Sequence, residues 1–188
     1  MGAASDARGF TLIEMLIAMS VLLVVITALT AAFAGAMKGE VDATARADDQ
    51  ESARQALDLM RRDIHCASGV VAPTPNAAGG YTVTFTETAS LCPQVTTGSA
   101  GIQWCTIPVT TGRYQLFREN SGNCDGVSST FEVDYVTNSL VWSLPACPTG
   151  QVQKVAVDIP VNRDPVTRPQ RTYELTDQIV MRNAPVCP

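Results

Sequence analysis

A long apolar run opens with the segment Gly9-Phe10-Thr11-Leu12-Ile13-Glu14-Met15-Leu16 and continues as far as Phe33. Glu14 carries the single ionisable side chain of this run, and neither proline nor glycine interrupts it after Phe10. A helix of roughly 24 residues is about 36 Å long, enough to cross a hydrocarbon core of about 30 Å. The run therefore predicts a membrane-spanning helix over residues 10–33.

The carboxylate of Glu14 is out of place in such a helix. A central acidic residue is unfavourable in lipid by about 2.5–3.5 kcal/mol on insertion scales. Glu14 is therefore a candidate functional residue that needs a partner. The alternative is a plain signal anchor in which Glu14 merely reaches the headgroups, but that interpretation leaves the Gly9-Phe10 pair and the short polar leader unexplained.

The leader ending at Gly9, the string Phe10-Thr-Leu-Ile-Glu14 and the apolar run resemble the class III signal of type IV prepilins and type II secretion pseudopilins. The resemblance implies that prepilin peptidase cleaves between Gly9 and Phe10 and N-methylates Phe10. Glu14 matches the family's glutamate at the fifth mature position. In a bundle of such helices, the freed amine and Glu14 of a neighbour can neutralise each other, because burial of either charge alone is penalised.

The acidic balance of the chain bears on its partners, and its cysteines predict that the part after the apolar run lies outside the cytoplasm. The chain has 188 residues and a formal net charge of −5, and this acidic balance argues against a general nucleic-acid binder. Six cysteines all follow the apolar run: Cys66, Cys92, Cys105, Cys124, Cys147 and Cys187. An even number on one side of a membrane helix indicates disulfides in an oxidising compartment, and the sequence leaves their pairing open.

Cysteine placement and the resemblance together predict the topology. The N-terminus is expected in the cytoplasm and the C-terminal domain outside it, in a single-pass protein of the plasma (inner) membrane. The resemblance implies a later location in an extracellular or periplasmic filament. The distribution of Lys and Arg around the apolar run supports this orientation only weakly.

The helix is expected to continue as an amphipathic segment over residues 34–67. Four apolar residues share one helix face, at spacings of four, three and four: Ala53, Leu57, Met60 and Ile64. The charged run Arg61-Arg62-Asp63 is interpreted as part of the solvated face, where Asp58 and Arg62 stand four residues apart and can pair. Pro73 and Pro75 follow Ser68-Gly69, so the helix should end near residues 66–69.

Beyond residue 68 the sequence has the alternation and turn signals of strands. The strict alternation of Tyr81–Glu87 predicts a half-buried strand. Two hairpins are predicted, one from residues 102–109 and 113–118 and one from residues 130–136 and 139–144. Further strand candidates are residues 152–161 and 173–182.

The predicted fold class is α+β, with a long N-terminal helix packed on a C-terminal antiparallel sheet, which is the pilin fold that the resemblance implies. The predicted domains are a leader (1–9), a transmembrane or filament-core helix (10–33), its amphipathic continuation (34–67) and a disulfide-containing β-rich domain (68–188).

No catalytic constellation is visible, so the chain is not expected to be an enzyme or to hold a cofactor. His65 and Cys66 are adjacent and therefore lie on different helix faces. One segment, Ser121 to Glu132, resembles a calcium loop in which Asn123, Asp125 and Glu132 are weak candidate ligands. A simple turn at Asp125-Gly126 is the favoured alternative.

The function that the resemblance implies is a structural subunit of a type IV pilus or type II secretion pseudopilus. Its implied partners are prepilin peptidase, other pilin or pseudopilin subunits, the plasma membrane and an assembly platform. The lack of proline within Val25–Ala32 is similar to minor pilins of the PilW class or the J-type minor pseudopilin.

Two alternatives stay open. One is a tip-located adhesin or DNA-uptake receptor, for which exposed residues around Trp104, Trp142 or Arg163 would be the sign. The other is a secreted disulfide-rich domain with a removable signal. The sequence does not distinguish a pilus from a secretion or DNA-uptake system.

Overall fold

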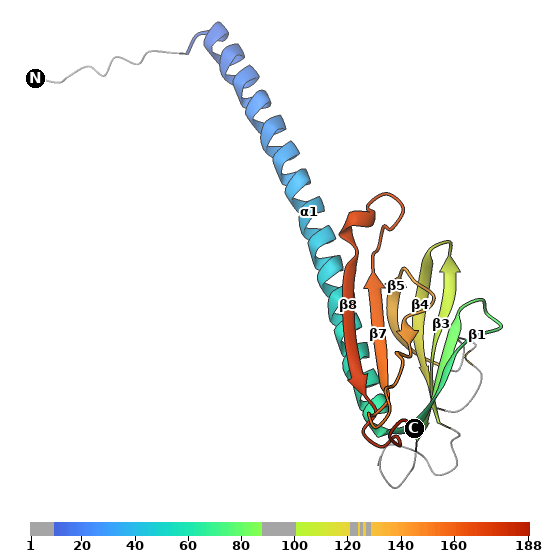
Figure 1. The fold of residues 1–188 in the computed structure, drawn as a ribbon. Helices are drawn as coiled ribbons and strands as arrows, with labels where there is room; N and C mark the ends of the chain where they lie inside the picture. Colours follow the sequence, from blue (N-terminus) through green and yellow to red (C-terminus); the bar gives the residue numbers. More distant parts are fainter. Residues whose placement is uncertain (1–9, 88–100, 121–123, 125, 127–128) are drawn as a thin grey trace, which may run out of the picture. The chain divides into compact units, whose positions relative to one another are not determined.

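The computed structural model describes residues 10–87, 101–120, 124, 126 and 129–188 (Figure 1). These residues form a long helix followed by an antiparallel sheet, so the predicted α+β fold class is confirmed. The elements in chain order are α1 (Leu12–Cys66), β1 (Ala67–Pro75), β2 (Tyr81–Glu87), β3 (Ile102–Thr110), β4 (Arg113–Glu119), β5 (Thr130–Val136), β6 (Trp142–Ser143), β7 (Lys154–Val161), the 3-10 helix η1 (Pro169–Arg171) and β8 (Tyr173–Val180).

The chain divides into two compact units, Met1–Ala45 and Arg46–Pro188, and α1 contributes to both. In the first unit, the described side chains from Phe10 to Val41 are all exposed. In the second unit, the remainder of α1 packs with the sheet around a shared apolar core. The two parts of α1 therefore differ in what their apolar side chains contact.

The core of the second unit contains the predicted apolar face of the helix. Ala53, Leu57, Met60 and Ile64 are at most 2% exposed, which confirms that prediction. The sheet contributes two fully buried indole rings, Trp104 and Trp142. The Nε1–H of Trp142 donates to the sulfur of Met60 over 3.2 Å, so the polar end of this ring is satisfied inside the core.

Strands β1 to β5 form a meander in which each strand pairs antiparallel with the next. The first predicted hairpin is confirmed as β3 and β4, which are joined through Gly112 in a left-handed conformation with φ of 72°. The two later strand candidates are confirmed as β7 and β8, which pair from Lys154 with Val180 to Val161 with Tyr173.

The second predicted hairpin is wrong. Both of its segments pair with β7: β5 through Val136 and Val161, and the two-residue β6 through Trp142 and Val157. The connecting segment also bonds to β7, since the Thr137 amide donates to the Pro160 carbonyl over 2.9 Å. Burial of the Trp142 ring in the core draws β6 against β7, which a pattern of local turn residues does not reveal.

The helix ends at Cys66, within the predicted range, and strand β1 begins at the next residue. The side-chain amide of Asn183 donates to the carbonyls of His65 and Cys66 over 3.0 and 3.2 Å, and so satisfies two free carbonyls of the last turn. Sequence patterns missed β1 because it contains two prolines. An edge strand tolerates proline, and β1 lies at one end of the sheet.

Candidate assembly site

The N-terminal turn of α1 is built around Thr11. The amide of Glu14 donates to the carbonyl of Thr11 over 3.1 Å and lies 3.3 Å from its hydroxyl, and the Met15 amide donates to the same carbonyl over 3.2 Å. Thr11 therefore caps the helix at its first turn. Gly9 lies outside the described residues, whereas Phe10 and Glu14 are described and exposed.

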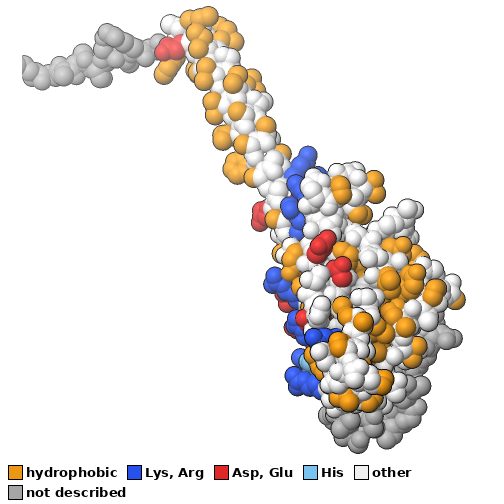
Figure 2. All heavy atoms as spheres, viewed as in Figure 1, with side chains coloured by type: hydrophobic (Ala, Val, Ile, Leu, Met, Phe, Trp, Pro, Cys, Tyr) orange, Lys and Arg blue, Asp and Glu red, His pale blue; other side chains and the backbone are white. Residues whose placement is uncertain are grey.

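The surface that follows is apolar along its length, as Figure 2 shows for the N-terminal part of α1. Over residues 10–33, the carboxylate of Glu14 is the single charge. Among the described residues, α1 is the one helix long and apolar enough to cross a membrane. A helix of this kind can lie in lipid or against other apolar helices, and Glu14 is the group that would need a partner in either place.

Two disulfides of the second unit join residues that lie 19 and 40 positions apart in the sequence. Cys105 of β3 is bonded to Cys124, with Cα atoms 6.1 Å apart, and Cys147 is bonded to Cys187, with Cα atoms 6.0 Å apart. Cys66, at the end of α1, is also disulfide-bonded. Cys92 lies outside the described residues.

Asp63 lies in the core, 4% exposed, which corrects its assignment to the solvated face of the helix. Its carboxylate accepts three hydrogen bonds, from Trp104 Nε1 at 2.8 Å and from Arg118 Nε and Nη2 at 2.8 and 3.0 Å. Sequence reasoning missed this group, although a signal was present. Asp63 follows Met60 by three residues and precedes the buried Ala67 by four, which places it on the apolar stripe.

The other charges of this helix segment also bond to the sheet. Arg61 reaches Asp177 of β8 at 2.7 Å and Asp58 at 2.6 Å, so Asp58 does not pair with Arg62 as predicted. His65 Nδ1 lies 2.9 Å from the Val180 carbonyl. Polar contacts to β8 and β4 thus supplement the apolar face in holding α1 to the sheet.

Glu87, at the end of β2, shares the surroundings of this buried ion pair. Burial raises the pKa of its carboxyl to about 7; the nearby Asp63 adds to this increase and Arg118 opposes it. Its Oε1 atom is buried and has no hydrogen-bond partner among the described residues. Glu87 is therefore a group whose ionisation opposes folding near neutral pH.

The free energy of unfolding should therefore fall as pH rises from about 4.5 through 7, because protonated Glu87 is favoured in the folded state. Glu87→Gln should remove about 1 kcal/mol of this pH dependence, a figure reduced for the solvent screening of a half-exposed group. Urea unfolding of the full chain in detergent at pH 5 and pH 8 measures the difference. Glu40→Gln, in an exposed glutamate of α1, is the control. An equal pH dependence in wild type and Glu87→Gln would contradict the assignment.

Of the three predicted calcium ligands, the structure describes Glu132 alone. Asn123 and Asp125 lie outside the described residues, and Glu132 lies on β5, where burial raises the pKa of its carboxyl. Among the described residues, no group of three or more His, Cys, Asp or Glu side chains is placed to hold a metal ion. The calcium loop stays a prediction.

Of the three residues that would mark a tip adhesin or DNA receptor, the two tryptophans are buried and Arg163 is exposed. Trp104 and Trp142 are at most 1% exposed. Arg163 forms a bidentate ion pair with Asp49 of α1, with nitrogen–oxygen distances of 2.8 and 3.0 Å. The expected sign of ligand binding is thus missing at the two tryptophans, and the adhesin or receptor alternative stays a prediction.

A family model, that of the prokaryotic N-terminal methylation motif, matches residues 5–30. This motif is the class III prepilin signal, and the matched residues include Phe10, Thr11 and Glu14. It supports a type IV pilin-like protein. It also supports processing by prepilin peptidase, and it points to a structural protein rather than an enzyme. The curated proteins and the solved structures give no match.

Proposed function

We propose that the chain is a minor subunit of a type IV pilus or of a type II secretion pseudopilus. The observation that carries the proposal is the methylation motif at residues 5–30, on a helix whose exposed apolar surface bears one carboxylate. The long helix followed by an antiparallel sheet fits this role. No cofactor is needed for it.

In this proposal, prepilin peptidase cleaves between Gly9 and Phe10 and methylates the new amine of Phe10. The apolar surface of α1 keeps the mature subunit in the membrane until assembly. In a bundle of such helices, the amine of one subunit and Glu14 of another neutralise each other. A subunit displaced by one turn, about 5.4 Å, would bury both charges without partners, so this pair sets the axial register.

The second unit, Arg46–Pro188, is called the sheet unit below. It is proposed to lie outside the cytoplasm, with residues 1–9 inside. Disulfides persist in oxidising compartments, and the sheet unit contains the pairs Cys105–Cys124 and Cys147–Cys187. The mature subunit would first be a single-pass protein of the plasma membrane and then part of an extracellular or periplasmic filament. Its partners there are other subunits and the assembly platform.

The minor character of the subunit is supported by the span itself. Residues Val25–Ala32 contain no proline, which resembles minor pilins of the PilW class or the J-type minor pseudopilin. An uninterrupted helix runs through this stretch of α1. Copy number relative to a major subunit in sheared fibres would measure this part of the proposal directly.

The mature chain should begin at N-methylated Phe10. Co-expression with and without prepilin peptidase, followed by intact mass and N-terminal sequencing of the membrane-extracted protein, tests this expectation. Without the peptidase, the leader should remain. A chain that keeps residues 1–9 in the presence of the peptidase, or one cut after Phe33, would overturn the proposal and leave an ordinary anchored or secreted domain.

A further inference from the structure

Tyr135, at the end of β5, has a left-handed backbone conformation with φ of 59°. This conformation costs a residue with a side chain about 1–2 kcal/mol, so it persists only where the surroundings hold it. The Tyr135 amide donates to Asp134 Oδ1 over 2.6 Å, and its carbonyl accepts from the Asn162 amide over 2.9 Å. The backbone is thus fixed on both sides of the ring.

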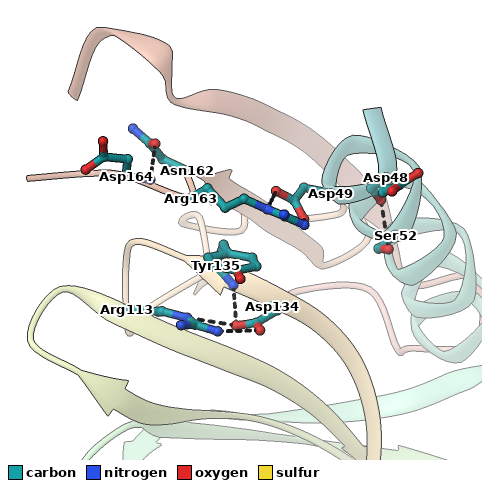
Figure 3. Close-up of polar contacts among 9 residues, drawn as sticks. All are labelled: Asp48, Asp49, Ser52, Arg113, Asp134, Tyr135, Asn162, Arg163 and Asp164. Atoms are coloured by element: carbon teal, nitrogen blue, oxygen red, sulfur yellow. Dashed lines mark hydrogen bonds and ion pairs between the residues drawn. The ribbon is translucent and has the colours of Figure 1, made fainter. Parts of the chain in front are cut away.

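The ring of Tyr135 lies between two guanidinium groups (Figure 3). Arg113 Cζ is 4.0 Å from the ring centroid and Arg163 Cζ is 4.7 Å from it. Both distances are within the range of cation–π attraction, and a planar guanidinium can stack on a ring while its edge binds a carboxylate. The aromatic ring therefore joins two arginines from different parts of the sheet unit.

A carboxylate faces each of the two arginines. Arg113 donates to Asp134 over 3.1 and 2.5 Å, and Arg163 donates to Asp49 over 2.8 and 3.0 Å. The two positive charges that flank the ring are therefore neutralised separately, and the order of groups is Asp49, Arg163, Tyr135, Arg113, Asp134. We name these five residues the Tyr135 clasp.

The clasp binds α1 ahead of its apolar contacts with the sheet. The first buried residue of α1 is Ala53, four residues after Asp49. The side chain of Asp49 is nevertheless only 13% exposed, because it lies against Arg163. Residues 46–52 contain no buried apolar side chain, and the ion pair of Asp49 with Arg163 ties this turn to the sheet.

We propose that the Tyr135 clasp holds residues 46–52 of α1 on the sheet. With the clasp open, the packing of α1 on the sheet would rest on the apolar contacts that begin at Ala53. In a fibre, a role that rests on the proposed function, tension transmitted along α1 would reach the clasp before the apolar core. Because the side chain of Arg163 is 41% exposed, salt weakens the clasp.

Hydrogen exchange of the full chain in detergent micelles tests the clasp, with mass spectrometry of peptides from residues 46–52 and from β2. Arg163→Ala should accelerate exchange in residues 46–52 by about tenfold, the combined effect of one ion pair and one cation–π contact. The β2 peptide should be unchanged. Raising the salt concentration to about 0.5 M should accelerate exchange of residues 46–52 in wild type and have little effect on it in Arg163→Ala.

Two matched pairs separate the clasp from a general loss of packing. Tyr135→Phe keeps the ring and should exchange as wild type does, whereas Tyr135→Leu should accelerate hydrogen exchange in residues 46–52. Arg182→Ala removes an exposed arginine that follows β8 and should have no effect. Asp49→Asn keeps the helix and removes the ion pair. If Arg163→Ala accelerates exchange in every peptide, exchange of residues 46–52 in Asp49→Asn decides whether the ion pair holds them.

Unchanged exchange of residues 46–52 in Asp49→Asn would overturn the proposal, and so would equal effects of Tyr135→Phe and Tyr135→Leu. The measurement needs neither cleavage by the peptidase nor a fibre. A chain that retains its leader would therefore contradict the proposed function without affecting the outcome for the clasp.

Discussion

Glu14→Ala should be cleaved and methylated like wild type but should be at least about a hundredfold depleted from sheared fibres. The reason is that the methylated amine of Phe10 would then enter an apolar helix bundle without its counter-charge, and a buried charge that has lost its partner is strongly unfavourable. Immunoblots of sheared fibres against the membrane fraction measure the depletion. Intact mass of the membrane-bound chain confirms that processing is unaffected.

Two further variants show whether charge is the cause. Glu14→Gln keeps the shape of the side chain and removes the charge, so it should be depleted as strongly as Glu14→Ala. Glu40→Ala removes an exposed glutamate of the same helix beyond the apolar run and should assemble normally. Normal incorporation of both Glu14 variants would contradict the proposed role of the amine–carboxylate pair.

The parts of the structure that follow from local sequence were predictable. The apolar run and the four-three-four spacing of Ala53, Leu57, Met60 and Ile64 gave the helix and its buried face. The β3–β4 hairpin was predictable because Gly112 supplies the left-handed residue that its turn requires. Each of these signals lies within a few residues of the structure that it predicts.

The parts that depend on distant residues were not predictable. The pairing of β6 with β7 depends on where the core accepts the Trp142 ring, and the nearby turn residues suggested β5 as its partner. The Tyr135 clasp joins Asp49 to Arg163, which are 114 residues apart. Charged residues such as Asp63 were assigned to solvent because their partners lie on strands whose arrangement the sequence pattern does not specify.

Asp63→Ala should reduce the free energy of unfolding by about 3–5 kcal/mol, the usual cost of removing one partner of a buried ion pair. The substitution leaves the guanidinium of Arg118, whose side chain is 14% exposed, facing a cavity, and it removes the acceptor of the Trp104 Nε1–H. Urea unfolding of the full chain in detergent, with disulfides intact, measures the loss. Fluorescence of the two buried tryptophans, Trp104 and Trp142, reports the transition.

A double variant separates the net value of the pair from the penalty of leaving one charge alone. Asp63→Leu combined with Arg118→Met should recover most of the stability lost in either single variant, because two apolar side chains remove both buried charges. Asp58→Ala, in an exposed aspartate of the same helix, should change the unfolding free energy by no more than about 0.5 kcal/mol. If Asp63→Ala were equally mild, the buried pair would contribute little, and the apolar face would have to hold α1 to the sheet alone. Strong destabilisation of the double variant would contradict the expected recovery.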